Sequence, residues 1–186
     1  MREGFVATKN GNIWYSVYGE EKSKTPLLVV HGGPGFVTMP EVIQEFSIDR
    51  PVYFYDQLGC GKSDRATDAD FYSLDNYIEE LAEVRNALKL TDVILMGFSW
   101  GCGLITTSVL KHGTEGVKGM VLSAPLLSSP MWEKDQRDNI ATMPPEMIRE
   151  IEEGERTQVF GEEYQSAMMA YYNKFVYQAS PWPDSL

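Results

Sequence analysis

The sequence predicts an α/β protein with a mostly parallel sheet, helices on both faces of the sheet and an antiparallel hairpin at the N-terminus. Two observations carry this prediction. Short apolar runs of strand length alternate with helical patterns over the first two thirds of the chain. The runs themselves are continuously apolar, as in strands buried on both faces of a parallel sheet. At 186 residues, 43% of them hydrophobic, the chain is long enough for a folded core.

The first expected elements are two strands, at residues 5–8 and 13–18, around Asn10-Gly11. Both turn residues tolerate positive φ, which makes this pair a strong hairpin signal. The sequence predicts four further strands, at residues 27–30, 52–55, 93–96 and 117–122.

Helical patterns lie between these strands. Ser73 is the expected N-cap of a helix whose apolar side chains share one face. These side chains are Leu74, Tyr77, Ile78, Leu81, Val84 and Leu88. A second helix runs from Leu104 to His112 and is expected to stop at Gly113. Alternating strands and helices predict right-handed crossovers between parallel strands.

The pattern changes after Ala124-Pro125. From Met131 onward the sequence predicts only helical stretches, among them residues 144–153 and 161–178. Ten acidic side chains stand against four basic ones between Met131 and Glu163, which indicates either a helical cap or a solvated pair of charged helices. We therefore expect a core over residues 1–126 and a helical cap segment over 127–186.

The charge and the cysteine content limit which partners and which kinds of site this chain is expected to have. The net charge of -11 repels phosphate, so neither a nucleic acid nor an anionic membrane is an expected partner, and a cationic ligand fits better. Cys60 and Cys102 lack the spacing of a zinc site and the density of a disulfide scaffold, so both are expected to be reduced thiols. No apolar stretch approaches membrane-spanning length, and a cytoplasmic location is expected.

Ser99 stands at the most informative position. The stretch Gly97-Phe98-Ser99-Trp100-Gly101 fits G-x-S-x-G, the turn that presents a nucleophilic serine between a strand and a helix. The chain reverses so sharply there that side chains at the two flanking positions would collide, which explains the glycines. The alternative is a glycine-containing strand end with an incidental serine.

Two more loops are expected at the same edge of the sheet. HGGPG, residues 31–35, follows one strand, and DQLGCGKSD, residues 56–64, follows the next. Ligands of open α/β sheets bind beyond the carboxyl ends of the strands, so the three loops together predict one site. The second loop lacks the G-x-x-x-x-G-K-[ST] spacing of a phosphate loop, so nucleotide binding is not expected.

The motifs HGGPG, DQLGCGKSD and GFSWG, in this order, resemble those of the proline iminopeptidases, or prolyl aminopeptidases, of the α/β-hydrolase fold. The resemblance extends to relatives that release other N-terminal residues or amino-acid amides. It also covers residues 171–174 and Pro181-Trp182-Pro183. The family usually has glycine where Phe98 and Cys102 stand, so the shape of the substrate pocket is expected to differ.

The resemblance implies an α/β-hydrolase fold and a serine peptidase that works through an acyl-enzyme. Ser99 would attack the carbonyl carbon, and the main-chain N–H groups of Trp100 and Gly33 would hold the oxyanion. The substrate would be a small peptide or amino-acid amide with a free N-terminus, and neither metal nor cofactor is expected. Four residues are expected to contact the substrate: Gly32, Phe98, Glu162 and Glu163. The two glutamates would meet the N-terminal amine.

None of the residues assigned so far can act as the general base for Ser99. A serine hydroxyl needs an adjacent base, and the chain has only two histidines. His31 opens the glycine loop, where a structural role is expected. His112 lies thirteen residues beyond Ser99, about 20 Å away along a helix. The resemblance implies that the triad acid and histidine follow two further strands. We therefore expect this chain to be the N-terminal part of a hydrolase, inactive alone, with a C-terminal fragment of the same protein as a candidate partner.

Two other functions remain open on sequence grounds. The same fold supports carboxylesterases and lactonases, although a neutral ester has no use for acidic side chains around its entry. The third possibility is a non-catalytic fragment that retains half of the sheet.

Overall fold

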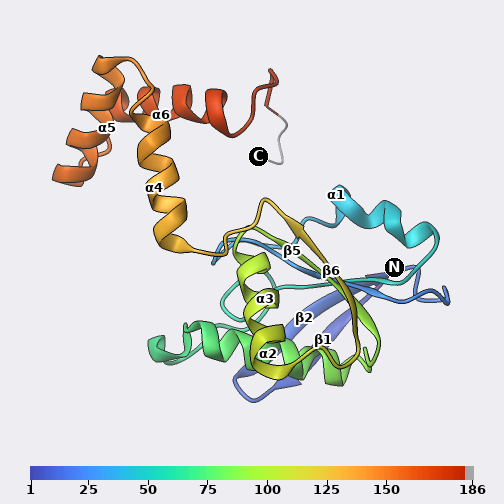
Figure 1. Cartoon of the computed structure of the whole chain (residues 1–186). Coiled ribbons are helices and arrows are strands. Elements are labelled where there is room, and N and C mark those ends of the chain that lie inside the picture. The colour runs from blue at the N-terminus through green and yellow to red at the C-terminus, as the bar shows by residue number, and fades with distance from the viewer. Residues whose placement is uncertain (183–186) are drawn as a thin grey trace. The chain divides into compact units, whose positions relative to one another are not determined.

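The computed structural model describes residues 1–182 and divides the chain into two compact units, Met1–Leu127 and Ser128–Leu186 (Figure 1). Pro183, the last residue of the Pro-Trp-Pro stretch, and the end of the expected cap segment lie outside the described residues.

The first unit contains one mixed sheet of six strands in the order β1-β2-β4-β3-β5-β6 (Figure 1). The strands are β1 (Arg2–Thr8), β2 (Gly11–Tyr18), β3 (Leu27–Val30), β4 (Val52–Tyr55), β5 (Val93–Phe98) and β6 (Val117–Ser123). β2 pairs antiparallel with β1 and β4, and the pairs β4-β3, β3-β5 and β5-β6 are parallel. The predicted hairpin and the four further strands are confirmed. The hairpin turn, however, is Lys9-Asn10, because Gly11 already pairs with Thr8 as the first residue of β2.

Two long helices of this unit were expected. They are α2 (Leu74–Ala87) and α3 (Trp100–His112). Ser73 is the N-cap of α2, since its side chain accepts a hydrogen bond from the N–H of Asn76 at 3.4 Å. Gly113 ends α3 with φ 83°, a conformation that favours glycine. Three short helices were not predicted from the sequence: α1 (Pro40–Ile43) and the 3-10 helices η1 (Gln44–Ile48) and η2 (Ala69–Phe71).

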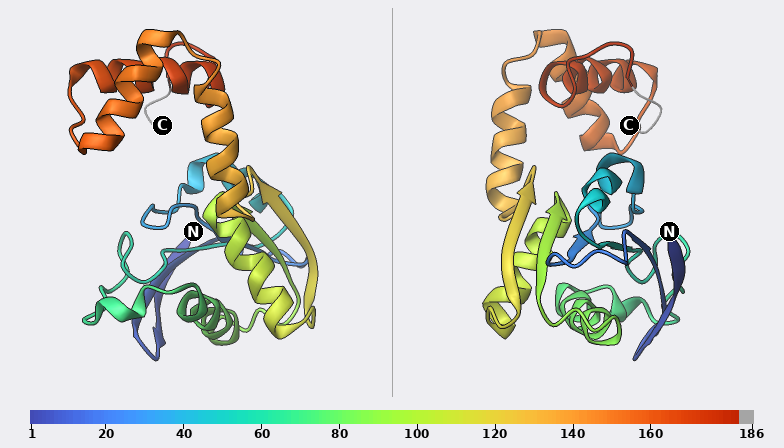
Figure 2. Two further views of the ribbon diagram at one scale, coloured as in Figure 1. Left: turned by 60° about the vertical axis from the view of Figure 1, so that its left-hand side comes forward. Right: turned by 90° about the vertical axis from the view of Figure 1, so that its right-hand side faces the viewer.

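The strands place apolar side chains on both faces of the sheet. In β3, Leu28 and Val30 pack in the core that α2 and α3 cover, whereas Leu27 and Val29 point to the opposite face. This alternation follows from the period of two in an extended strand. Figure 2 shows α2 and α3 on one face and the α1 region on the other. The larger core therefore lies between the sheet and the two long helices.

The second unit is helical. Its helices are α4 (Ser129–Ile140), α5 (Pro145–Thr157) and α6 (Glu162–Phe175). A small core holds α5 and α6 together, made by Ile140, Met143, Ile151, Ala167 and Tyr171. The predicted helices at 144–153 and 161–178 are confirmed with shifted ends, and α4 lies in the part of the chain expected to be helical, although no bounds were predicted for it. Within residues 1–182, no helix combines the length and apolarity needed to cross a membrane.

Candidate active site

Ser99 occupies a strained turn between β5 and α3. Its backbone has φ 48° and ψ -114°, which is unfavourable for a residue with a side chain. A Cβ on Gly97 would lie 2.6 Å from the main-chain N of Cys102, and one on Gly101 would lie 2.2 Å from the carbonyl oxygen of Val30. Only glycine fits at both positions, so the steric reason expected for the G-x-S-x-G pattern is confirmed.

The main chain of Ser99 is held by hydrogen bonds while its side chain stays free of capping. The N–H of Ser99 donates to the carbonyl of Ser123 at 3.0 Å, and the carbonyl of Ser99 accepts from the N–H of Leu126 at 3.2 Å. Ser99 is also the N-cap of α3, yet its hydroxyl makes no hydrogen bond to the helix. The hydroxyl is therefore available at the positive end of a helix dipole.

A cavity of about 220 Å³ opens beside this serine. Ser99, Gly32 and Phe98 line it together, so the structure brings three of the predicted site residues to one place. The remaining walls are largely apolar and include Val29, Phe36, Val37 and Met39. These walls were not predicted from the sequence, although three of the apolar residues follow HGGPG directly in the chain.

The two expected oxyanion donors lie in different segments: Trp100 begins α3, and Gly33 belongs to the glycine loop. Trp100 is the first residue of α3, so its N–H has no carbonyl partner within the helix. Gly33 has φ 126°, and a Cβ there would lie 2.6 Å from the N of Gly35. Gly32, and not Gly33, lines the cavity with Ser99. A Cβ on Gly32 would lie 3.4 Å from the Cβ of Ser99, which shows how closely the glycine loop approaches the serine.

His31 is a buried structural residue, as expected. Its Nε2 accepts a hydrogen bond from the main-chain N–H of Gln57 at 3.0 Å, so the ring proton lies on Nδ1, which donates to the carbonyl of Gly32 at 2.8 Å. Burial lowers the pKa of His31 below its usual value, which keeps the ring neutral. Both ring nitrogens are engaged, so His31 cannot take a proton from Ser99 in this arrangement.

Gln57 connects the three loops and was not identified as a site residue from the sequence. Its side chain is buried; Nε2 donates to the carbonyl of His31 at 3.1 Å, and Oε1 accepts from Nε1 of Trp100 at 3.2 Å. One amide group therefore fixes the glycine loop relative to the first residue of α3. The signal in the sequence was a polar pair, Asp56-Gln57, directly after an apolar strand.

Asp56 holds the second loop in place. Its Oδ1 accepts from the N–H and the hydroxyl of Thr38 at 3.1 and 3.0 Å, and its Oδ2 accepts from the N–H of Lys62 at 2.9 Å. A Cβ on Gly61, which has φ 44°, would lie 2.0 Å from Oδ2. The DQLGCGKSD loop thus supports the site instead of presenting its carboxylate to a ligand.

Three further residues of the first unit that were considered from the sequence do not line this cavity. His112 is exposed at the end of α3, with Nε2 3.4 Å from Oε1 of Glu79, as expected for a surface imidazole. Cys60 and Cys102 are both free and buried, and burial raises the pKa of each thiol.

Glu162 and Glu163 belong to the second unit. They form the first turn of α6 and are exposed. With Glu146 and Glu150 of α5 they line a hollow of about 370 Å³. The second unit thus carries a concave surface with four carboxylates.

A serine on a strained strand-to-helix turn, at the carboxyl end of parallel strands and beside an apolar cavity, defines the class of α/β proteins with a nucleophile elbow. The chain belongs to the α/β-hydrolase fold family, whose model matches residues 25–173. The resemblance to proline iminopeptidases is confirmed by a relative named proline iminopeptidase in Heyndrickxia coagulans. That relative is 38% identical over 188 residues, which cover 99% of this chain and 64% of the relative.

Solved structures agree with this assignment. The crystal structure of proline iminopeptidase from Mycobacterium smegmatis matches with a TM-score of 0.84 and 25% identity, and that of VinJ matches with 0.87 and 29%. Each match covers 98% of this chain and 64% of the other. The chain therefore spans 64% of the length of each of these three relatives, which is less than two thirds.

Proposed function

We propose that this chain carries the nucleophile of a serine peptidase that releases N-terminal residues, proline among them, from peptides or amino-acid amides. The observation that carries the proposal is the position of Ser99, which lies on a strained turn, makes no side-chain hydrogen bond to α3 and lines the 220 Å³ cavity. The similarity to proline iminopeptidases supports the choice of substrate.

The proposed reaction begins with addition of Ser99 Oγ to the carbonyl carbon of the scissile amide. The carbonyl oxygen becomes negatively charged, and the N–H groups of Trp100 and Gly33 are the proposed donors to it. Each such donor contributes about 3 to 4 kcal/mol to transition-state stabilisation in well-studied cases. The general base takes the proton of the Ser99 hydroxyl and passes it to the nitrogen of the scissile amide. The C–N bond then breaks, the amine leaves, and water hydrolyses the acyl-enzyme that remains.

The cavity beside Ser99 is the proposed binding site for the side chain of the released residue. Gly32 allows close approach, and Phe98 and its apolar neighbours exclude water from the acyl group. Because proline iminopeptidases usually have glycine where Phe98 stands, Phe98 is the residue proposed to narrow this cavity and set its selectivity.

Glu162 and Glu163 are the proposed partners of the substrate's N-terminal ammonium group. Their support is the concave surface that they share with Glu146 and Glu150. Carboxylates at such a surface attract a cationic substrate and reject a neutral one. This charge favours a peptidase over an esterase.

The general base is proposed to come from polypeptide outside this chain. Both histidines of the chain are accounted for, because His31 is fully hydrogen bonded and His112 lies at the far end of α3. The isolated chain is then inactive, and a C-terminal fragment of the same protein is the proposed partner. The proposed compartment is the cytoplasm, where Cys60 and Cys102 stay reduced.

A carboxylesterase is the second candidate, and the apolar lining of the cavity beside Ser99 favours it, since an acyl chain would fit there. The two candidates differ in whether the substrate carries an ammonium group. Arylamides of proline and alanine, compared with a short acyl ester, separate them.

The test uses this chain alone and this chain mixed with the part of the Heyndrickxia coagulans relative outside the matched region. We expect arylamide hydrolysis and fluorophosphonate labelling of Ser99 in the mixture and neither in the chain alone. Ser99→Ala should abolish both. Hydrolysis of the ester alone would support the esterase, and Ser99→Ala activity above about a hundredth of wild type would contradict the role of Ser99.

A further inference from the structure

We propose that Glu80 is a positioning residue of the candidate active site. Its carboxyl group holds the main chain at Leu58, and this keeps Gln57 where it joins the glycine loop to the first residue of α3. The inference deepens the proposed function and depends on it, because the position of these loops affects catalysis only if Ser99 is the nucleophile. Glu80 itself does not line the cavity beside Ser99.

Two side chains of α2 hold both polar main-chain groups of Leu58. Oε2 of Glu80 accepts a hydrogen bond from the N–H of Leu58 at 3.0 Å, and the hydroxyl of Tyr77 donates to the carbonyl of Leu58 at 3.1 Å. Tyr77 and Glu80 are three residues apart and therefore lie on the same face of the helix. All three residues are buried. One turn of α2 thus fixes the loop after β4 at a single residue.

The hydrogen bond between Leu58 and Glu80 also fixes Gln57. The N–H of Leu58 belongs to the same planar peptide group as the carbonyl of Gln57, and that carbonyl accepts from the N–H of Cys60 at 2.9 Å. Glu80 and Cys60 therefore hold the two ends of this peptide group. The side chain of Gln57 leaves the adjacent Cα and reaches Nε1 of Trp100 at 3.2 Å, so its position depends on the orientation of the peptide.

The same turn of α2 also contacts Trp100. The rings of Tyr77 and Trp100 pack edge to face, with their centroids 6.3 Å apart and their planes at 80°. The indole is therefore held by a ring of α2 and by the amide of Gln57. Because Trp100 follows Ser99 directly and its N–H is a proposed oxyanion donor, a shift of Gln57 relative to α2 would reach the nucleophile.

Glu80 is a costly residue at this position. It is 3% exposed, and within residues 1–182 its Oε1 has no hydrogen-bond partner and no cation forms an ion pair with it. A buried polar atom without a partner destabilises a fold, whereas an apolar side chain would pack there without this cost. The other buried residues of α2 are aliphatic or aromatic: Tyr77, Ile78, Leu81 and Val84. Its oxygen that accepts from Leu58 is what Glu80 adds to this face.

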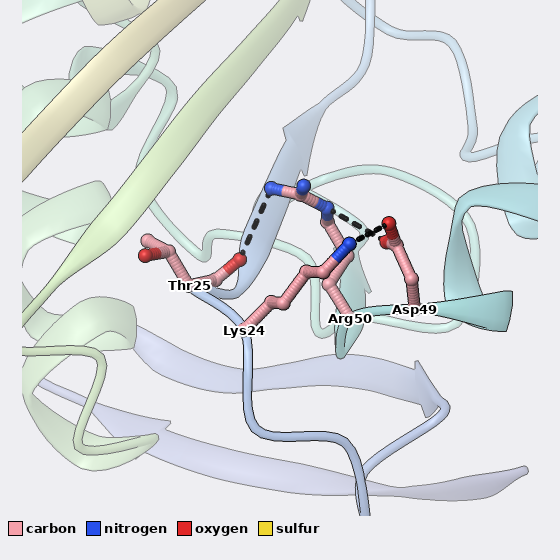
Figure 3. Close-up of polar contacts among 4 residues, drawn as sticks. All are labelled: Lys24, Thr25, Asp49 and Arg50. Atoms are coloured by element: carbon pink, nitrogen blue, oxygen red, sulfur yellow. Dashed lines mark hydrogen bonds and ion pairs between the residues drawn. The ribbon is translucent and has the colours of Figure 1, made fainter.

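Asp49 is the contrasting case of a carboxylate at the surface. Figure 3 shows it between two cations: Lys24 Nζ lies 2.5 Å from Oδ2, and Arg50 Nε lies 3.2 Å from Oδ1. The hydrogen bond from Lys24 lowers the pKa of Asp49, which keeps it ionised. Glu80 has no such partner in the described part of the chain, and burial raises its pKa to about 8. Its carboxyl group is therefore neutral at pH 7 and ionises near pH 8.

Four other titratable groups lie near Glu80: Tyr55 of β4, Cys60 of the loop after β4, and Tyr77 and Glu83 of α2. Burial raises the pKa of both tyrosines and of the cysteine above their usual values, so Glu80 loses its proton before any of these three. Glu83 is partly exposed, and its Oε2 accepts from the N–H of Lys9 at 2.8 Å. Glu83 is thus the group that a pH experiment on Glu80 has to control.

The first experiment follows the indole N–H of Trp100 by NMR in the labelled chain alone, since this group donates to Gln57. Trp100→Phe assigns the signal. We expect the wild-type signal to shift with a midpoint near pH 8. In Glu80→Gln it should stay at its low-pH position, because the amide oxygen still accepts from Leu58 and the amide has no proton to lose. Glu83→Gln is the matched control and should keep the titration. Absence of a titration in wild type, or an unchanged one in Glu80→Gln, would overturn the proposal.

Glu80→Leu tests the hydrogen bond itself, because leucine fills much of the same volume and has no acceptor for the N–H of Leu58. In this variant the indole proton of Trp100 should exchange with solvent about tenfold faster, whereas in Glu80→Gln it should exchange at the wild-type rate. Wild-type exchange in a folded Glu80→Leu protein would refute the positioning role. If Glu80→Leu does not fold, the titration of Glu80→Gln decides.

Labelling of Ser99 by a fluorophosphonate connects position with reactivity. It uses the mixture with the unmatched part of the Heyndrickxia coagulans relative. At pH 7 Glu80→Leu should be labelled about tenfold more slowly, while Glu80→Gln and Glu83→Gln stay within about threefold of wild type. Equal rates for Glu80→Leu and wild type would contradict the positioning role. Absence of labelling in every protein would instead contradict the proposed function, and the NMR result on the chain alone would still decide whether Glu80 positions Gln57 and Trp100.

Discussion

The main-chain N–H of Gln57 donates a hydrogen bond to Nε2 of His31 across 3.0 Å, and both residues are buried. This bond joins the loop after β3 to the loop after β4. Because the side chain of Gln57 also reaches the indole of Trp100, the three loops around Ser99 depend on each other.

Replacing His31 should destabilise the fold. His31→Ala leaves the buried N–H of Gln57 without a partner and opens a cavity, so the free energy of unfolding should fall by about 2 to 4 kcal/mol. Urea denaturation measures the change. His112→Ala is the control, because that ring is exposed, and it should stay within about 0.5 kcal/mol of wild type. Similar losses in both variants would argue against a special role of His31.

The glycines of the elbow should not tolerate a methyl group. Gly101→Ala places a Cβ 2.2 Å from the main-chain oxygen of Val30, so β3 and α3 must move apart. We expect a loss of stability of about 3 kcal/mol or more, measured by thermal unfolding. Gly119→Ala in β6 is the matched control, since nothing lies within 4 Å of its Cβ. A neutral Gly101→Ala would disprove the steric account.

Glu162 and Glu163 should improve the binding of a substrate only when that substrate carries a positively charged amine. In the active mixture of chain and partner polypeptide, Glu162→Gln and Glu163→Gln should each raise KM for proline arylamide by about three- to tenfold. The rate of an ester without an amine should stay unchanged, because only the ammonium group interacts with these carboxylates. Glu152→Gln, an exposed glutamate of α5 that does not line the hollow, is the control. An equal rise of KM for the ester would exclude amine recognition.

Glu80 of α2 should make the stability of the protein depend on pH. Its carboxyl is buried and accepts one hydrogen bond, from the N–H of Leu58 at 3.0 Å, and burial raises its pKa from 4.5 to about 8. The folded state therefore holds a proton that the unfolded state has lost between these two values. Stability should be highest below about pH 5 for this group and fall by about 1 kcal/mol per pH unit up to about pH 8.

Glu80→Gln removes this ionisation and keeps the shape of the side chain. The variant should show a flatter dependence of unfolding free energy on pH and exceed wild type in stability above about pH 7. Glu79→Gln is the control, because Glu79 is exposed and paired with Lys111, which lowers its pKa. An unchanged slope in Glu80→Gln would show that other groups cause the dependence.

Most of the strands and helices of the first unit could be predicted from local patterns in the sequence. The strands follow from short apolar runs, α2 and α3 from helical spacing, and Ser99 from a motif whose glycines have a steric cause. α1 and η1 were missed because elements of four or five residues leave too little periodicity to detect. The bounds of α4 were not predicted because its sequence is mostly polar and only Ile140 is buried, which leaves no apolar face to mark its ends.

The residues that hold the site together were harder to predict from the sequence than the nucleophile itself. The roles of Asp56 and Gln57 depend on contacts with Thr38, His31 and Trp100, which are 18 to 43 residues away along the chain. No local pattern encodes such contacts. The apolar walls of the cavity likewise come from separate strands and loops, so the sequence identified the reactive group but not the shape of the space beside it.

The bend at residue 99 is shaped by main-chain bonds to Ser123 and Leu126 and by the glycines on either side. None of these constraints involves the atoms of the side chain at its apex. A carboxylate or a thiol side chain at this position would point in the same direction as the hydroxyl. The turn thus fixes where the side chain at position 99 is presented, independently of which reactive group that side chain carries.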